Sequence, residues 1–207
     1  VIGAGPAGLD IAGFDDRERA VLATIEEVAV DATTVRPADV VDPFADHPYL
    51  AELPDGGFAP PQPDWPEQTR VTGFPMFDES GQREVPRELL DFLDAGDPPV
   101  VFTPGSAMDR GGRFFAEAVA ALRLLGRRGI LLSRFADTIP SGLPAGVRHF
   151  PYIPFSRLLP RCAALAYHGG VGTCAQALQA GIPHLVQPMA HDQLDNLSRV
   201  RDLGVGD

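Results

Sequence analysis

The residues with the clearest chemical potential are a histidine and a set of small residues near the C-terminal end of the chain. His168 is followed by Gly169, Gly170, Gly172 and Thr173. Glycines that open a helix leave backbone N–H groups free to bind an anion, and the Thr173 hydroxyl could add a bond and cap the helix. A histidine N–H can donate to a phosphate oxygen and complements a diphosphate that gains charge as it leaves. We therefore expect an anion site here, suited to a diphosphate.

A second polar pair stands a little further along the chain. Asp192 and Gln193 follow the apolar run His184-Leu185-Val186 and precede a helical pattern. A carboxylate accepts hydrogen bonds, and an amide both donates and accepts them, so the pair suits the hydroxyl groups of a sugar. The spacing of the two groups places each at a strand–helix junction.

Both groups need a scaffold that brings strand ends together, and the pattern after residue 98 predicts one. We expect strands at 99–103, 129–133, 147–150, 163–167 and 184–186, and helices at 114–125, 155–160, 172–180 and 193–203. Alternating strands and helices predict the α/β class with a parallel, Rossmann-like sheet. Such sheets bind ligands at the carboxyl ends of their strands, where His168 and Gln187 onward would lie.

The chain divides into three parts by composition. Residues 1–63 read as an irregular acidic segment with one helical pattern at Arg17–Val30, residues 64–97 as a linker with an acidic helix near 87–93, and residues 98–207 as the α/β domain. Residues 1–97 hold 21 acidic residues and 6 arginines, net −15, whereas residues 98–207 hold 7 acidic residues and 11 arginines, net +4. The second half is therefore the better place for an anionic ligand.

Composition also excludes several classes of protein. A net charge of −11 argues against nucleic acid as a partner, because phosphate backbones need a basic surface. All 17 basic residues are arginine, which excludes a P-loop lysine and a Schiff-base lysine. Two cysteines cannot form a disulfide scaffold, no ligand cluster predicts a metal, and no apolar stretch approaches the ~20 residues of a membrane span. We expect a soluble, cytoplasmic protein.

A glycine motif at the start of the chain leaves one alternative open. Gly3, Gly5 and Gly8 match the Gly-x-Gly-x-x-Gly fingerprint of FAD- and NAD-binding sites. Only two residues precede Gly3, and no second strand ending in an acidic residue follows at the required distance. A flavin or nicotinamide site is therefore a minor hypothesis.

Residues 147–206 resemble the nucleotide-sugar-binding half of GT-B fold glycosyltransferases, in particular bacterial UDP-glycosyltransferases of the sterol and macrolide glucosyltransferase group. The resemblance rests on Tyr167–Thr173, on Ala180-Gly181-Ile182-Pro183 and on Pro188–Asn196, and it extends upstream to Phe58. It implies that residues 58–66 and 71–75 belong to the end of an acceptor domain and its interdomain linker, and that 98–207 form the donor-binding domain. It also implies a truncated chain, because residues 1–57 are too short for an acceptor domain and the family continues beyond residue 207.

The resemblance assigns roles to individual residues. Diphosphate binding falls to Ser106, His168, Gly169, Gly170, Gly172 and Thr173, nucleoside binding to Tyr152, Ile153 and Gln176, and sugar binding to Asp192 and Gln193. Arg110 is a further candidate for the phosphates, although a surface arginine fits equally well. No catalytic base is identified, because the resemblance places it on the acceptor domain, and neither His47 nor His149 is favoured.

The expected activity is transfer of a hexose, in the first place glucose, from a UDP-sugar to a hydroxyl of a lipophilic acceptor. The resemblance implies one inverting displacement without a metal, and the nucleotide sugar is a co-substrate, so that no cofactor is expected. The alternatives are a rhamnosyltransferase that uses a dTDP-sugar, an inactive remnant that only binds nucleotide, and the FAD- or NAD-binding protein mentioned above.

Overall fold

The computed structural model describes residues 84–106, 108 and 111–207, together with single or paired positions at 50–51, 58, 63–64, 70–71, 76, 78 and 80–81. The expected helix at Arg17–Val30, the Gly3–Gly8 motif, His47 and Arg110 lie outside the described residues. Among the upstream positions, β1 (Leu50–Ala51) pairs in parallel with β2 (Arg70–Val71).

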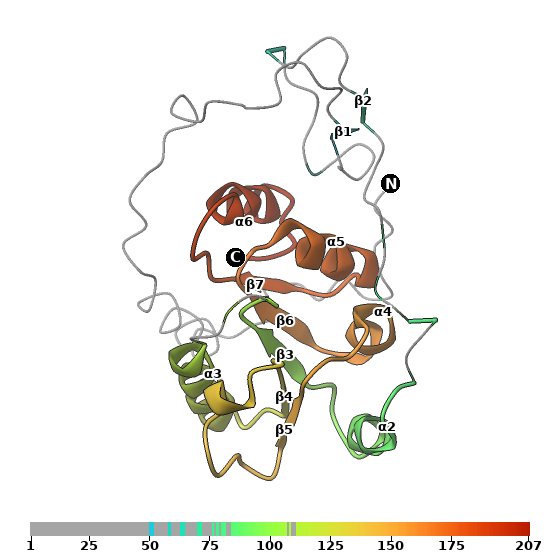
Figure 1. Ribbon diagram of the computed structural model, residues 1–207, viewed down its shortest axis with the longest axis vertical. Helices are drawn as coiled ribbons and strands as arrows, with labels where there is room; N and C mark the ends of the chain where they lie inside the picture. The colour runs from blue at the N-terminus through green and yellow to red at the C-terminus, as the bar shows by residue number, and fades with distance from the viewer. Residues whose placement is uncertain are drawn as a thin grey trace.

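A five-stranded parallel sheet forms the centre of the domain (Figure 1). Its strands are β3 (Val100–Thr103), β4 (Gly129–Leu132), β5 (Val147–Phe150), β6 (Ala164–Tyr167) and β7 (His184–Val186). Their spatial order is β5-β4-β3-β6-β7, so the chain builds outward from β3 in one direction and then returns to its other side. The order reverses between β3 and β6, and the crevice at such a point is where open α/β sheets bind ligands. The predicted fold class is confirmed.

Helices cover both faces of this sheet (Figure 1). The helices are α2 (Arg87–Asp94), α3 (Gly112–Leu125), α4 (Phe155–Leu158), α5 (Val171–Ala180) and α6 (Gln193–Asp202), with 3-10 turns at Ala136–Thr138 and Leu159–Arg161. Alternate residues of each strand point to opposite faces. Phe102 and Leu131 therefore pack with α3, whereas Val101 and Leu165 belong to the core that α2, α4 and α5 share. Among the described residues no helix is long and apolar enough to cross a membrane.

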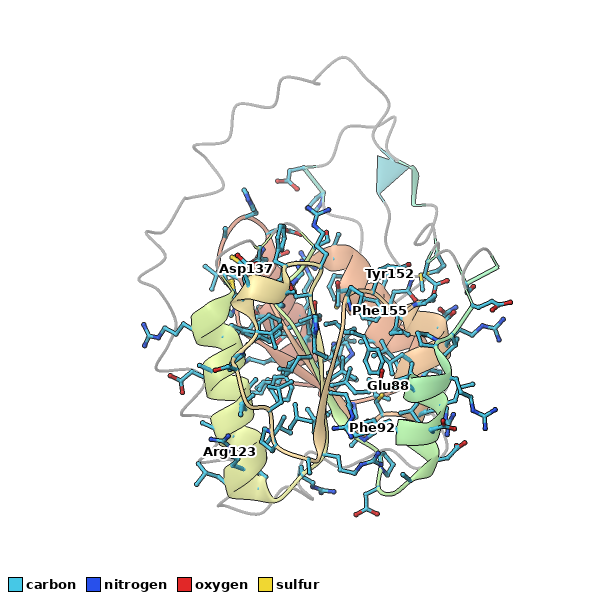
Figure 2. The ribbon with its side chains drawn as sticks, turned by 60° about the horizontal axis from the view of Figure 1, so that its bottom comes forward. Glu88, Phe92, Arg123, Asp137, Tyr152 and Phe155 are labelled. Atoms are coloured by element: carbon cyan, nitrogen blue, oxygen red, sulfur yellow. The ribbon has the colours of Figure 1, made fainter. Side chains whose placement is uncertain are left out.

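Helix α2 falls within the predicted linker but packs on the domain that follows it. Its Leu89, Phe92 and Leu93 are buried in the core shared with α4 and α5. The guanidinium of Arg128 lies 4.0 Å from the centre of the Phe92 ring, at the lower end of α2 in Figure 2. A cation over an aromatic ring is attracted by the negative face of the ring's quadrupole, so this contact ties the helix to the segment that leads into β4. The boundaries at residues 63 and 97 stay predictions.

Two polar side chains are buried together beneath the end of β6. Tyr167 is the last residue of β6, and its side chain is fully buried, with its hydroxyl 3.2 Å from Nδ1 of His184. The local sequence pattern could not indicate this contact, because His184 lies on β7. His184 is 4% exposed, and no partner for its Nε2 lies among the described residues. Burial lowers the pKa of His184 from 6.5 to about 4.

This burial predicts that acid destabilises the fold through His184. Its folded pKa lies below its unfolded pKa, so the stabilisation is complete above pH 6.5 and is lost as the pH falls toward 4. Between pH 7 and pH 5 the free energy of unfolding should fall by about 2 kcal/mol more in the wild type than in His184→Leu. Urea denaturation at the two pH values measures the difference, because the other titrating groups cancel between the two proteins. Equal pH dependence would show that His184 is accessible to protons in the folded state.

Candidate functional site

The predicted polar groups gather at the carboxyl ends of β3, β6 and β7, beside the point where the strand order reverses. Three loops leave the sheet there, beginning at Pro104, His168 and Gln187. These loops are brought together by the parallel pairing of β6 with β3 and with β7, which aligns Tyr167 with Thr103 and with Val186. The sheet therefore brings together most of the binding residues that the sequence predicted.

The imidazole of His168 occupies a slot between two glycines. A Cβ built on Gly105 would lie 2.8 Å from Cε1 of the ring, and a Cβ on Gly170 would overlap Nε2. Gly105 also has a φ of +97°, a conformation that side chains rarely tolerate. The ring is thus clamped between the loop after β3 and the loop after β6. Gly105 was not predicted as a site residue, although it adjoins the predicted Ser106.

The surroundings of His168 favour its neutral form. Burial lowers its pKa, and the nearby carboxylate of Asp192 opposes this shift only in part. Its Nδ1 is buried, and among the described residues it has no hydrogen-bond partner. A buried polar atom without a hydrogen-bond partner lowers the stability of the fold. A ligand atom that hydrogen-bonded to Nδ1 would remove this cost, which would favour binding. The neutral ring can donate one hydrogen bond without carrying a charge of its own.

The N-terminus of α5 stands directly after this ring. Gly170 is the N-cap, without a side-chain capping bond, and Cys174 N donates the first helical bond to Gly170 O. The N–H groups of Val171, Gly172 and Thr173 therefore have no partner within the helix. A Cβ on Gly172 would meet nothing within 4 Å, which leaves open space beside these donors. The expectation that Thr173 caps α5 was wrong, because the helix begins two residues earlier and Thr173 lies in its first turn.

Gly169 serves the packing of this loop. It is buried with a φ of +92°, and a Cβ there would lie 2.8 Å from Cγ1 of Val186 and 3.1 Å from Cβ of Gln193. Only glycine lets the loop after β6 pass so close to β7 and α6. Its predicted role in binding a diphosphate stays a prediction.

Asn196 joins the two predicted groups of binding residues. Its Nδ2 donates to Gly169 O at 2.8 Å and to Oδ2 of Asp192 at 2.8 Å, and its side chain is only 4% exposed. Both hydrogens of one amide are therefore used between the diphosphate loop and the sugar-binding carboxylate. Sequence reasoning missed this role, although Asn196 stands one helical turn after Asp192 and so shares its face.

The predicted pair Asp192 and Gln193 divides into an exposed and a buried member. Gln193 is 8% exposed, and its Oε1 accepts from the backbone N–H of Met189 at 2.7 Å and of Ala190 at 2.9 Å. These bonds close a turn in which His191 has a φ of 58°. The exposed Asp192 is thus the member that presents a carboxylate to solvent, while the carbonyl oxygen of Gln193 shapes the turn.

The remaining predicted residues lie around this centre in different environments. Ser106 is exposed, Tyr152 is 40% exposed, and both Ile153 and Gln176 are buried. Since the Ile153 side chain is in the core, only its backbone could contact a ligand. His149 lies on β5, and its Nε2 is 2.8 Å from Ser133 O. This contact gives His149 a structural role. No group of three metal-ligating side chains lies within the described part of the chain.

Two proteins with similar sequences carry the names of glycosyltransferases. Residues 130–207 match the family described as erythromycin biosynthesis protein CIII-like, C-terminal domain. The chain is 39% identical to O-mycaminosyltylonolide 6-deoxyallosyltransferase of Streptomyces fradiae over 76% of this chain and 37% of that protein. It is 35% identical to vancomycin aglycone glucosyltransferase of Amycolatopsis orientalis over 79% of this chain and 39% of that protein. The chain thus spans less than two fifths of either relative.

Solved structures agree with the sheet and its helices. The glycosyltransferase SnogD from Streptomyces nogalater aligns with a TM-score of 0.51 and 29% identity, over 69% of this chain and 40% of that one. The kitacinnamycin glycotransferase aligns with a TM-score of 0.62 and 24% identity, over 76% of this chain and 40% of that one. The second likeness is one of fold alone.

Gly170→Ala should displace the His168 ring without straining the backbone. Gly170 has a φ of −62°, which alanine adopts freely, so that only the overlap with Nε2 opposes the substitution. We expect a clear shift of the His168 ring signals in NMR spectra and a loss of about 1–3 kcal/mol in the free energy of unfolding. Gly172→Ala is the matched control, because its Cβ enters open space. Equal spectral shifts in both variants would contradict the slot.

Asn196→Asp should destabilise the fold more than Asn196→Ala. The aspartate would set an acceptor against Gly169 O and Asp192 Oδ2, two groups that now receive hydrogen bonds. We expect a loss of about 3 kcal/mol at neutral pH, since each unpaired buried polar group costs about 1–3 kcal/mol. Urea denaturation of both variants measures it. An Asn196→Asp variant that is more stable than Asn196→Ala would contradict the assigned donors.

Proposed function

This chain belongs to the GT-B glycosyltransferases that carry an erythromycin biosynthesis protein CIII-like C-terminal domain, and from this premise we propose that it binds a nucleotide-sugar donor for hexosyl transfer. The acceptor would be a hydroxyl group of a lipophilic small molecule. The single observation that carries the proposal is the placement of His168 beside the first-turn N–H groups of α5, which have no partner within the helix.

This arrangement suits a diphosphate better than other anions of sugar chemistry. The first-turn N–H groups of α5 and the positive end of its dipole favour negative charge. The buried Nδ1 of His168 supports the same assignment, because a phosphate oxygen within reach would give this nitrogen a partner. Asp192 stands one loop away with an exposed carboxylate, where it could accept from the hydroxyls of the attached sugar.

The proposed reaction is one displacement at the anomeric carbon. The acceptor oxygen forms the new bond to this carbon, the bond to the diphosphate oxygen breaks, and the acceptor proton passes to a base outside the described residues. Negative charge grows on the departing diphosphate, and His168 with the α5 N-terminus would stabilise it more in the transition state than in the ground state. Attack opposite the leaving group inverts the anomeric centre. In this proposal the positive field comes from the protein, so no metal is required.

The sugar and nucleotide are proposed in order of preference. Glucose from a UDP-sugar stays the first choice, and the relative named as a glucosyltransferase supports it. The second candidate is a dTDP-linked deoxyhexose, a class of donors that includes dTDP-rhamnose. The relative named as a 6-deoxyallosyltransferase favours that class. A chain that binds nucleotide without transferring a sugar is the third.

Titration of the chain with UDP and with dTDP in a calorimeter tests the proposal. We expect saturable binding of at least one nucleotide, and a loss of about 10- to 100-fold in His168→Ala, since a hydrogen bond to a charged group contributes about 1.5–3 kcal/mol. Arg123→Ala is the control, because Arg123 is exposed near the end of α3 and lies far from Tyr152 in Figure 2. A folded wild-type chain that binds neither nucleotide would contradict the proposal.

A further inference from the structure

Asp78 makes three hydrogen bonds, of which only the one from Ser80 N is local in the sequence. Its Oδ2 accepts from Ser156 N at 2.7 Å, its Oδ1 accepts from Ser80 N at 3.2 Å, and its backbone oxygen accepts from the Tyr152 hydroxyl at 2.8 Å. Two of these partners stand more than 70 residues further along the chain. They flank Ile153-Pro154, the centre of the segment predicted to hold the nucleoside.

The bond to Ser156 N replaces a cap that α4 lacks. Its N-cap is Pro154, which has no side-chain acceptor and makes no capping bond. The first-turn N–H of Ser156 therefore needs an acceptor from elsewhere, and the Asp78 carboxylate supplies it. Burial raises the pKa of Asp78, but the hydrogen bonds from Ser156 and Ser80 outweigh it and hold this pKa below its ordinary value. The charged carboxylate is thus the form that the contacts favour.

The bond from Tyr152 fixes an aromatic ring at the surface. Tyr152 is 40% exposed, yet its hydroxyl is tied to the backbone of Asp78. In Figure 2 Tyr152 and Phe155 lie close together, above the helix that carries Glu88 and Phe92. A ring held at its far end loses less conformational entropy when a base stacks on it than a free ring does.

We propose that Asp78 is a positioning residue for the nucleoside half of the donor site. Its backbone oxygen sets the Tyr152 ring and its carboxylate sets the start of α4, so that residues 152–156 are in place before the nucleotide arrives. Its own turn holds the carboxylate through the bond from Ser80 N. The inference rests on the proposed function, because a nucleoside must be bound for this segment to matter.

Calorimetric titration with UMP and UDP tests this role, with hydrogen exchange at the Ser156 amide as a second readout. Asp78→Ala should weaken both nucleotides by a similar factor of about tenfold, as expected for one lost charge-assisted hydrogen bond. Asp78→Asn keeps one acceptor oxygen and should lose only part of this affinity. Tyr152→Phe removes the hydroxyl but keeps the ring, and it should weaken both nucleotides as well. In Asp78→Ala the Ser156 amide should exchange faster.

The controls separate this role from general stability and from the proposed function. Asp91→Ala removes an exposed carboxylate of α2 and should leave the affinity unchanged. His168→Ala should weaken UDP more than UMP, in contrast to Asp78→Ala. Wild-type affinity in a folded Asp78→Ala chain would overturn the inference alone, as would equal losses in Asp78→Asn and Asp78→Ala. If the wild type binds dTDP in place of UDP, dTMP and dTDP replace UMP and UDP in these titrations. A wild-type chain that binds none of these four nucleotides would overturn the proposed function, and the inference with it.

Discussion

The slot that holds the His168 ring is the constraint on which the rest of the site depends. The ring fits only because Gly105 and Gly170 lack side chains, and these glycines belong to loops that leave different strands. Parallel pairing of β3 with β6 brings the two loops into contact. A change in the register of this pair would therefore open the slot and move the imidazole away from the N-terminus of α5.

Side chains outside the slot hold the surrounding loops at fixed positions. Asn196 ties the loop after β6 to Asp192, and Gln193 closes the turn after β7. Asp78 does the same for the segment around Tyr152. In each case a polar side chain satisfies backbone groups of a loop, which fixes the loop without filling the space that a ligand would need. The proposed binding residues are therefore supported by further side chains, of which Asn196 and Asp78 had no predicted role.

The sequence was sufficient to predict features that depend on neighbouring residues of the chain. The segments 147–150 and 184–186 became strands with the predicted bounds, because Val147, Phe150 and Val186 pack into the cores on the two faces of the sheet. The same reasoning located His168 at the end of β6. It failed where a contact joins distant segments: the contact between the Tyr167 hydroxyl and His184 joins β6 to β7, and no local pattern indicates it. The cap predicted from Thr173 failed since the boundary of a helix is poorly marked by sequence.

The roles of Gly105, Asn196 and Asp78 could not be predicted for the same reason. Each acts on a residue that only the folded chain brings near it, as Asp78 acts on Ser156 across 78 positions. The resemblance to glycosyltransferases named the groups that would touch a ligand. It did not name the groups that hold them.

A crystal structure of the chain with UDP would show directly whether His168 and the start of α5 hold the diphosphate. We expect the diphosphate at the N-terminus of α5, with an oxygen within hydrogen-bond distance of the His168 ring and the base against Tyr152. A diphosphate bound at any other edge of the sheet, with the His168 slot unchanged and empty of ligand contacts, would contradict this expectation.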